Sequence, residues 1–191
     1  MRKELILEVA TKKFAEKGYN CSLSEIAKES GIRKQTLYNY FESKDALLLE
    51  IIGIETTNYF ESKKSEFLTF KDFNSEERLH RMFLSIIEYF SNREKFMFWR
   101  WMVLIDSESL KKSFRESTKA PEKRFVETIY TVFSSGIESK EIKDLPILPL
   151  INTYYALIHG VLESILLIED EAAASIYVNN VWTIFWQGIK Y

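Results

Sequence analysis

Residues 22–48 have the sequence SLSEIAKESGIRKQTLYNYFESKDALL, in which a glycine-containing turn separates two short helical segments. The first segment starts at Ser22, whose hydroxyl can cap the free amide of Glu25 while the Glu25 carboxylate reaches back, an arrangement called a capping box. This segment ends by Gly31, and the second covers about residues 34–40. Two helices of this length and separation are typical of a helix-turn-helix, in which the second helix lies in the major groove of DNA.

The rest of the chain has the apolar spacing of an all-α protein. Only six glycines and three prolines interrupt 191 residues, and apolar residues mostly recur three and four positions apart. We expect about nine helices, among them one over about 3–17 that stops at Gly18 and one that opens at Ser43 with Asp45 in its first turn. Further helices are predicted to contain the apolar series within 79–90 and to cover about 93–105, 121–135, 149–168 and 172–189, with Pro121 at a first helical position.

The composition excludes several classes of protein. With 26 basic and 28 acidic residues the net charge is −2, so any contact with nucleic acid has to be local rather than a property of the whole surface. The single cysteine, Cys21, cannot form an internal disulfide, and with only His80 and His159 there is no cluster to hold zinc. No glycine-rich phosphate loop and no HExxH motif occur, so we expect neither a cofactor nor a metal.

The chain is expected to stay in the cytoplasm. Charged residues from Arg2 onward leave no apolar N-terminal stretch of signal-peptide length. The uncharged stretch from Leu145 to Leu162 approaches the length of a membrane-spanning helix, but prolines interrupt it and acids rather than basic anchors flank it. We therefore predict a buried helix in this stretch and no membrane partner.

The 22–48 stretch closely resembles the DNA-binding signature of the TetR family of transcriptional regulators, including the Tyr-x-Tyr-Phe ending and the Ser-Lys start of the following helix. The strong resemblance covers about a quarter of the chain, and the remainder is similar to the family in helical composition and length. It implies a helix-turn-helix DNA-binding domain over residues 1–45 and a helical ligand-binding and dimerisation domain over 46–191. The implied function is that of a homodimeric repressor that a small-molecule ligand releases from a palindromic, double-stranded DNA operator.

The helix-turn-helix divides into an apolar side and a polar side. Its apolar residues are expected to pack against Val9 and Phe14 and to hold the second helix rigid; they are Ile26, Ala27, Ile32, Leu37 and Phe41. The polar residues then face outward, where Gln35 or Asn39 can pair with an adenine edge and Arg33 can read guanine. The methyl group of Thr36 or a tyrosine ring can touch a thymine methyl.

The family resemblance adds contacts to the DNA backbone. It implies that Tyr38, Tyr40 and Lys44 hold phosphates, with Lys44 at a helix N-terminus that suits an anion. Arg33 stands where the family usually has a capping Ser or Thr, and Gln35 where it has a small residue, so an unusual operator is expected. The alternative is that these polar residues are merely solvated. The predicted DNA-binding residues are Ser22, Ser24, Arg33, Lys34, Gln35, Thr36, Tyr38, Asn39, Tyr40 and Lys44.

The two C-terminal helical segments carry apolar residues on more than one side, which predicts burial on two sides. Helix-turn-helix proteins usually dimerise to bind half-sites about 34 Å apart. The resemblance implies that these two segments pair with their copies in a four-helix interface, in which Gly160 lets the backbones approach closely. The alternative is an intramolecular core alone. The predicted interface residues are Leu157, Gly160, Val161, Ser164, Ile165, Val181, Trp182 and Phe185.

Aromatic residues gather within 96–102 and in two later segments, and such surfaces suit an apolar pocket for a small apolar or aromatic ligand. Arg100 would suit an anionic ligand and Glu163 or His159 a cationic or hydrogen-bonding one, so the charge of the ligand stays open. Ordinary core packing is the alternative, and with it a constitutive DNA-binding factor without an inducer. The predicted ligand-binding residues are Phe96, Trp99, Arg100, Trp101, Tyr130, Phe133, Tyr155, His159 and Glu163.

An enzyme would need a nucleophile with a base, paired carboxylates, a metal cluster or a phosphate loop, and the sequence contains no recognisable pattern for any of these. Cys21 with a distant His80 is the nearest candidate, but a lone cysteine beside a helix start is typically structural. We therefore predict that the protein is not an enzyme. A thiol-based redox switch at Cys21 stays open as a weaker alternative.

Overall fold

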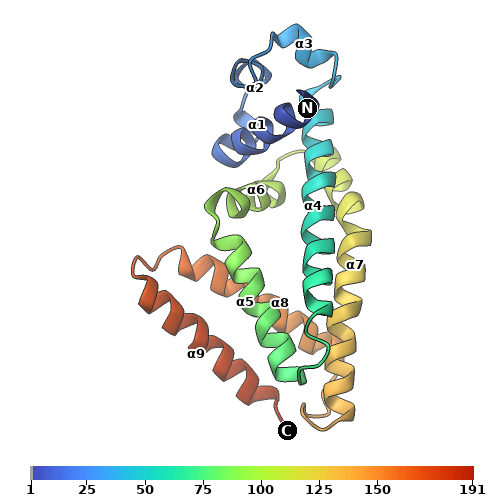
Figure 1. Ribbon diagram of the computed structural model, residues 1–191, viewed down its shortest axis with the longest axis vertical. Coiled ribbons are helices and arrows are strands. Elements are labelled where there is room, and N and C mark those ends of the chain that lie inside the picture. Colours follow the sequence, from blue (N-terminus) through green and yellow to red (C-terminus); the bar gives the residue numbers. More distant parts are fainter. Residues whose placement is uncertain (1) are drawn as a thin grey trace. The chain divides into compact units, whose positions relative to one another are not determined.

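The computed structural model describes residues 2–191, which form nine α-helices and one short 3₁₀ helix (Figure 1). The elements in chain order are α1 (Arg2–Lys17), η1 (Gly18–Asn20), α2 (Leu23–Glu29), α3 (Lys34–Tyr38), α4 (Lys44–Leu68), α5 (Ser75–Ser91), α6 (Arg93–Leu104), α7 (Glu108–Glu138), α8 (Ile147–Ile165) and α9 (Glu171–Ile189). The all-α fold class and the number of helices that the apolar spacing predicts are confirmed.

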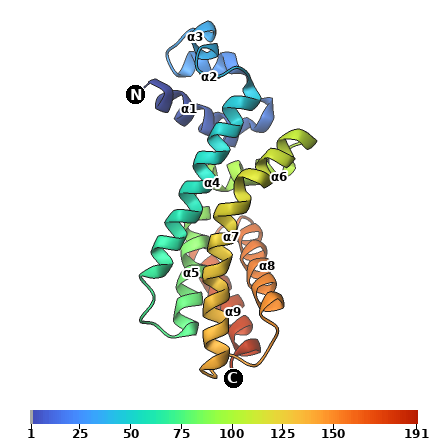
Figure 2. The ribbon, with the colours of Figure 1, turned by 90° about the vertical axis from the view of Figure 1, so that its right-hand side faces the viewer.

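Packing divides the chain into two compact units. The first holds the residues up to Tyr59 and Asn92–Pro121, and the second holds Phe60–Ser91 and Glu122–Tyr191. α6 therefore packs with the N-terminal helices, along α1, although it follows α5 in the chain. In the second unit α8 packs against both α5 and α9, and Figure 2 shows α8 alongside α9. The functional division at residues 45 and 46 stays a prediction.

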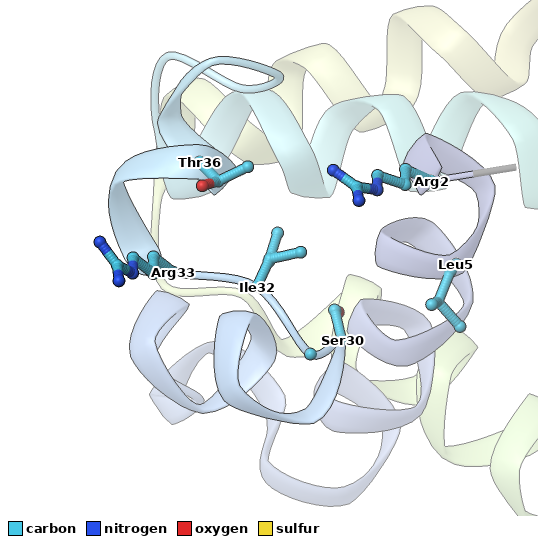
Figure 3. A pocket seen from close by; sticks show the side chains of 7 residues that line it. Arg2, Leu5, Ser30, Ile32, Arg33 and Thr36 are labelled. Atoms are coloured by element: carbon cyan, nitrogen blue, oxygen red, sulfur yellow. The ribbon is translucent and has the colours of Figure 1, made fainter.

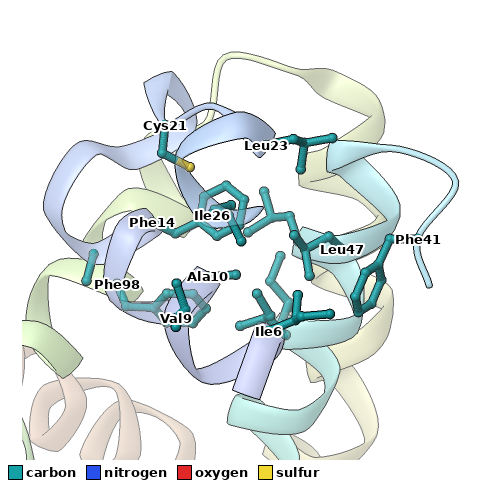
Figure 4. Packing of buried hydrophobic residues seen from close by; sticks show 14 of the residues in the cluster. Ile6, Val9, Ala10, Phe14, Cys21, Leu23, Ile26, Phe41, Leu47 and Phe98 are labelled. Carbon is teal, nitrogen blue, oxygen red and sulfur yellow. The ribbon is translucent and has the colours of Figure 1, made fainter. Parts of the chain in front are cut away.

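The core of the first unit explains why its three short helices are held rigidly. α1 buries Ile6, Val9, Ala10 and Phe14, whose spacing places them on one helical face (Figure 4). The same cluster contains Ile26, Ala27, Leu37 and Phe41 of the helix-turn-helix and, from α6, Phe98 and Met102. Ile32 is only half-buried and packs against this cluster from outside. The predicted apolar side of the helix-turn-helix is thus present.

Gly18 ends α1, and a side chain at this position would be unfavourable both for the backbone conformation and for packing. Its φ angle is +57°, in the left-handed region where glycine is favoured. A Cβ atom at this position would lie 2.7 Å from the indole ring of Trp101 on α6. The stop predicted at Gly18 is therefore also the place where α6 packs against the end of α1.

The second unit is built on the apolar face of α5. Leu79, Met82, Phe83, Ile86 and Ile87 of the predicted series are buried. Opposite them, fully buried Tyr154 of α8 donates a hydrogen bond to the Leu79 backbone carbonyl at 2.8 Å. A buried polar group needs such a partner, because an unmade hydrogen bond costs about 1–3 kcal/mol.

The start of α7 is where the sequence prediction is wrong. Pro121 was expected at the first position of a helix, but α7 begins at Glu108 and contains Pro121 in its interior. A proline inside a helix removes one backbone hydrogen bond and costs about 3 kcal/mol. Buried residues stand on both sides of it, Leu110 and Thr118 before and Phe125 after. Burial on both sides outweighs the local preference, which is only a weak guide to helix limits.

Candidate functional site: a nucleic-acid interface

α2 begins with the predicted capping box. The Glu25 amide donates to Ser22 Oγ at 3.1 Å, and the Ser22 amide donates to Glu25 Oε2 at 2.8 Å. Lys17, in the last turn of α1, donates to the other carboxylate oxygen of Glu25. The hydrogen bond from Lys17, together with those from Ser22, lowers the pKa of Glu25 to about 2. The start of α2 is thereby tied to the end of α1.

The turn between α2 and α3 has the geometry of a Schellman motif. The Ile32 amide donates to the Ala27 carbonyl at 2.9 Å and the Gly31 amide donates to the Lys28 carbonyl at 3.1 Å. Gly31 has a φ angle of +67°, as this motif requires at the residue after the cap. These bonds satisfy two carbonyls at the end of α2 and set the direction in which α3 leaves.

α3 presents the polar side that the sequence predicts. Leu37 points into the core and is fully buried, whereas Lys34, Gln35, Tyr38 and Asn39 are exposed. Thr36 is half-buried, and the remaining predicted contacts Ser22, Ser24, Arg33 and Tyr40 are exposed. Arg33 has extended backbone and forms no side-chain cap for α3, in keeping with its departure from the family pattern. The arrangement leaves polar donors and acceptors accessible on a rigid support.

Lys44 at the start of α4 is held by a residue that the sequence reasoning missed. Its Nζ donates to the backbone carbonyl of Tyr19 and lies 4.0 Å from the centroid of the Tyr19 ring. The Tyr19 hydroxyl donates to Asp45, and this hydrogen bond raises the pKa of Tyr19 to about 12. Tyr19 lies before the signature stretch, so nothing in the 22–48 pattern pointed to it.

The predicted interface residues divide into interior and accessible ones. Val161, Trp182 and Phe185 are buried in the core of the second unit; Trp182 is 4% exposed and stacks on Trp186. In the single chain these three side chains are covered by other residues of the second unit, and their part in an interface stays a prediction. Gly160 is exposed, and the half-buried members are Leu157, Ser164, Ile165 and Val181. The prediction omitted Ile176 and Ile184 of α9, of which Ile184 is 75% exposed.

The predicted ligand-binding residues fall in two separate units. Phe96, Trp99, Arg100 and Trp101 belong to α6 in the first, and the other five belong to α7 and α8 in the second. Trp101 covers Gly18, and Phe133 is fully buried with its ring 6.1 Å from that of Tyr154. Exposed members are Arg100, Tyr130, His159 and Glu163.

Tyr155 on α8 stands out among these residues. Its hydroxyl oxygen is buried without a hydrogen-bond partner in the described part of the chain. Burial raises the pKa of this hydroxyl, with a further increase from the charge of Glu122. A buried hydroxyl that no protein group satisfies is a candidate donor to a bound ligand.

Cys21 is enclosed in the core of the first unit (Figure 4). Burial raises the pKa of its thiol, which opposes formation of the reactive thiolate. Within residues 2–191, no group of three or more His, Cys, Asp or Glu side chains is placed to bind a metal ion. None of the helices described above is long and apolar enough to cross a membrane.

Comparison with known proteins relates this geometry to a family. The sequence profile of "Bacterial regulatory proteins, tetR family" matches residues 6–51, from α1 into α4. YuxN, an HTH-type transcriptional regulator of Bacillus subtilis, is 49% identical over 63 residues, which are 32% of this chain and only 20% of YuxN. QacR, an HTH-type transcriptional regulator of Staphylococcus aureus, is 28% identical over 135 residues, which are 70% of each chain.

A solved structure extends the likeness to the whole fold. A transcriptional regulator from Saccharomonospora viridis, crystallised in complex with choline, matches with a TM-score of 0.80. The two chains are 22% identical, and the match covers 99% of this chain and 97% of the other. The helix-turn-helix segment thus matches the tetR family of bacterial regulatory proteins, and the whole chain shares its fold with a solved tetR family transcription regulator.

Proposed function

We propose that the protein is a sequence-specific DNA-binding transcriptional regulator, and that it acts as a homodimeric repressor which a small molecule releases from a palindromic operator. The observation that carries the proposal is the exposed polar side of α3 on a buried apolar support, within the segment that matches the family profile. A protein of this function works in the cytoplasm on the bacterial chromosome. Its relatives are regulators rather than enzymes.

Base recognition is assigned to the exposed side of α3. Gln35 and Asn39 carry amides that can pair with adenine in two hydrogen bonds, and Arg33 carries the guanidinium that suits guanine. Each such pair discriminates against a wrong base by about 1–3 kcal/mol. Lys34, whose Nζ lies 5.9 Å from the Tyr38 ring centroid, and Thr36 complete this surface.

Backbone recognition is assigned to Tyr38, Tyr40 and Lys44, with Ser22 and Ser24 at the start of α2. Tyr38 and Tyr40 are exposed, so their hydroxyls are accessible to phosphate oxygens. Lys44 is already oriented by Tyr19, which limits the conformations that its ammonium group has to lose on binding. Contacts of this kind position the protein on the duplex without reading sequence.

We expect Tyr38→Ala and Lys44→Ala to weaken binding to a duplex that the wild-type protein selects from random DNA. Lys44→Ala should also lower the slope of log K against log salt by about one unit, because one fewer counterion is released. Fluorescence anisotropy at several salt concentrations measures both effects. Lys119→Ala, which removes an exposed lysine of α7 in the same unit, is the charge-matched control. If both variants bind as tightly as the control, the DNA-binding assignment is wrong.

Pairing of two chains is assigned to α8 and α9. To the accessible residues of the predicted interface we add three strongly exposed side chains, Ile176 and Ile184 of α9 and Leu167 just after α8. Large exposed apolar side chains on a protein surface favour association. A selected DNA site without two-fold symmetry would count against a pair of recognition helices.

A small apolar or aromatic ligand is assigned to the second unit, near Tyr155 and Phe133. The unsatisfied Tyr155 hydroxyl and the neighbouring buried rings support this location. The Saccharomonospora relative was crystallised with choline, so choline belongs in the first set of compounds to test. Release of bound duplex by a member of that set supports an inducible repressor. A duplex that no small molecule releases indicates a constitutive DNA-binding factor instead.

A further inference from the structure

A hollow beside α3 is lined in part by Arg2 and Ser30, two residues to which no role has been assigned above. It has a volume of about 330 Å³ and lies between the start of α1, the turn after α2 and the start of α3 (Figure 3). Its lining includes Arg2, Leu5, Ser30, Ile32, Arg33 and Thr36. Because α1, α2 and α3 share one buried core, the shape of this hollow is fixed by the same packing that supports the recognition helix.

The charge of the lining favours an anion. Arg2 and Arg33 are the charged residues of the lining, which contains no carboxylate among the residues described. The guanidinium group of Arg2 reaches over the hollow, whereas that of Arg33 points away from it (Figure 3). Both arginines are exposed, and the Arg2 side chain extends from α1 toward Thr36 (Figure 3). A guanidinium group presents several donors in a fixed plane, a geometry that matches phosphate oxygens.

The polar lining contains a donor that the protein itself leaves unused. Ser30 is only 7% exposed, and its buried Oγ has no hydrogen-bond partner among the residues described. Buried polar groups are nearly always satisfied, so such a hydroxyl points to a group outside the chain. Thr36, which carries a second hydroxyl, lines the hollow on the α3 side.

The position of the hollow identifies the source of the anion. Thr36 and Arg33 border it and also belong to the surface assigned to base recognition, so a duplex read by α3 carries its backbone past this point. We propose that Arg2, with the hydroxyls of Thr36 and Ser30, binds a backbone phosphate of the operator. This inference rests on the proposed DNA-binding function, and it adds a contact from outside the signature stretch.

The variant Arg2→Gln tests the proposal, with Arg115→Gln as the matched control. Arg115 is an exposed arginine of α7 in the same unit, so both variants change the net charge equally. Arg2→Gln should lower the slope of log K against log salt by about 0.9, the value for one phosphate on duplex DNA. The variant should weaken binding to selected and to unselected duplexes by the same factor, because a phosphate contact carries no sequence information. Arg115→Gln should match the wild type, and unchanged thermal unfolding of both variants shows intact folding.

The outcomes separate this inference from the proposed function. If the wild type binds duplex and Arg2→Gln keeps its salt slope, the phosphate contact is wrong and the DNA-binding function stands. If the wild type binds no duplex, both are overturned. A second arm uses inorganic phosphate against chloride at constant ionic strength. If phosphate raises the melting temperature of the wild type but not of Arg2→Gln, while the salt slopes agree, the hollow binds a free anion and the DNA source is wrong.

Discussion

At the scale of single residues, two glycines with positive φ angles control how the helices α1, α2 and α3 are connected. Gly18 and Gly31 have φ angles of +57° and +67°. They differ in their surroundings, since a Cβ at Gly18 would meet the Trp101 ring while one at Gly31 would meet nothing within 4 Å. The pair therefore separates the cost of backbone conformation from the cost of a steric clash.

We expect Gly31→Ala to lower the free energy of unfolding by about 1–2 kcal/mol, the cost of a left-handed conformation for a residue with a side chain. Gly18→Ala should cost more, because the indole of Trp101 must also shift. Gly53→Ala is the control: Gly53 lies inside α4 with open space around it, and alanine there should stabilise by about 0.5–1 kcal/mol. Urea unfolding at one protein concentration measures all three. Equal losses of unfolding free energy for the Gly18→Ala and Gly31→Ala variants would contradict a clash with Trp101.

At the scale of elements, the connection between α1 and α2 depends on the ionisation of Glu25. Its carboxylate accepts from Lys17 of α1 and from the Ser22 amide, and its pKa falls from the ordinary 4.5 to about 2. A lowered pKa in the folded state means that the charged form contributes stability. This contribution is complete above about pH 4.5 and is lost as the pH falls through about 2.

We therefore expect Glu25→Gln to lower the melting temperature at neutral pH, with a difference from the wild type that shrinks as the pH falls from 4.5 toward 2. Thermal unfolding followed by circular dichroism across this range measures the difference. Glu116→Gln, which changes an exposed acid of α7, is the control with the same charge change. A Glu25→Gln difference that stays constant with pH would show that the ionised carboxylate does not contribute.

Several elements could be predicted from the sequence because their causes are local. The Ser22 capping box, the stop at Gly18 and the buried face of α1 each depend on residues a few positions apart, and all three are present. The start of α7 could not be predicted, because a proline inside a helix is tolerated only when buried residues on both sides support it. The limits of α3 are also shorter than the expected 34–40, since the helix ends at Tyr38.

At the scale of the whole molecule, the proposed function requires two chains. Gly160 of α8 is exposed, and a Cβ there would meet nothing within 4 Å in the single chain. The open space beside it is what a second backbone would occupy in a close interface. A larger residue at this position should therefore weaken dimer formation and leave the folding of the chain unchanged.

We expect the wild type to be a dimer at micromolar concentration and Gly160→Leu to shift it toward monomer. Leucine should not disturb the fold of the chain, because it enters open space there. Analytical ultracentrifugation measures the mass, and circular dichroism checks the helical content. Thr131→Leu, at an exposed position on α7, adds comparable apolar surface and should leave the dimer intact. A wild-type monomer, or a dimeric Gly160→Leu, would show that α8 does not pair two chains at this glycine.

The sequence by itself determined the helix-turn-helix, because capping, turn geometry and the apolar face of each short helix arise between near neighbours in the chain. The tertiary structure alone decided which of the polar and apolar residues are accessible. It placed Trp182 and Phe185 inside the core, set Tyr19 against Lys44, and brought Arg2 beside Thr36. Each of these depends on segments that lie far apart in the chain and meet only when the helices pack, and no local pattern records which segments meet.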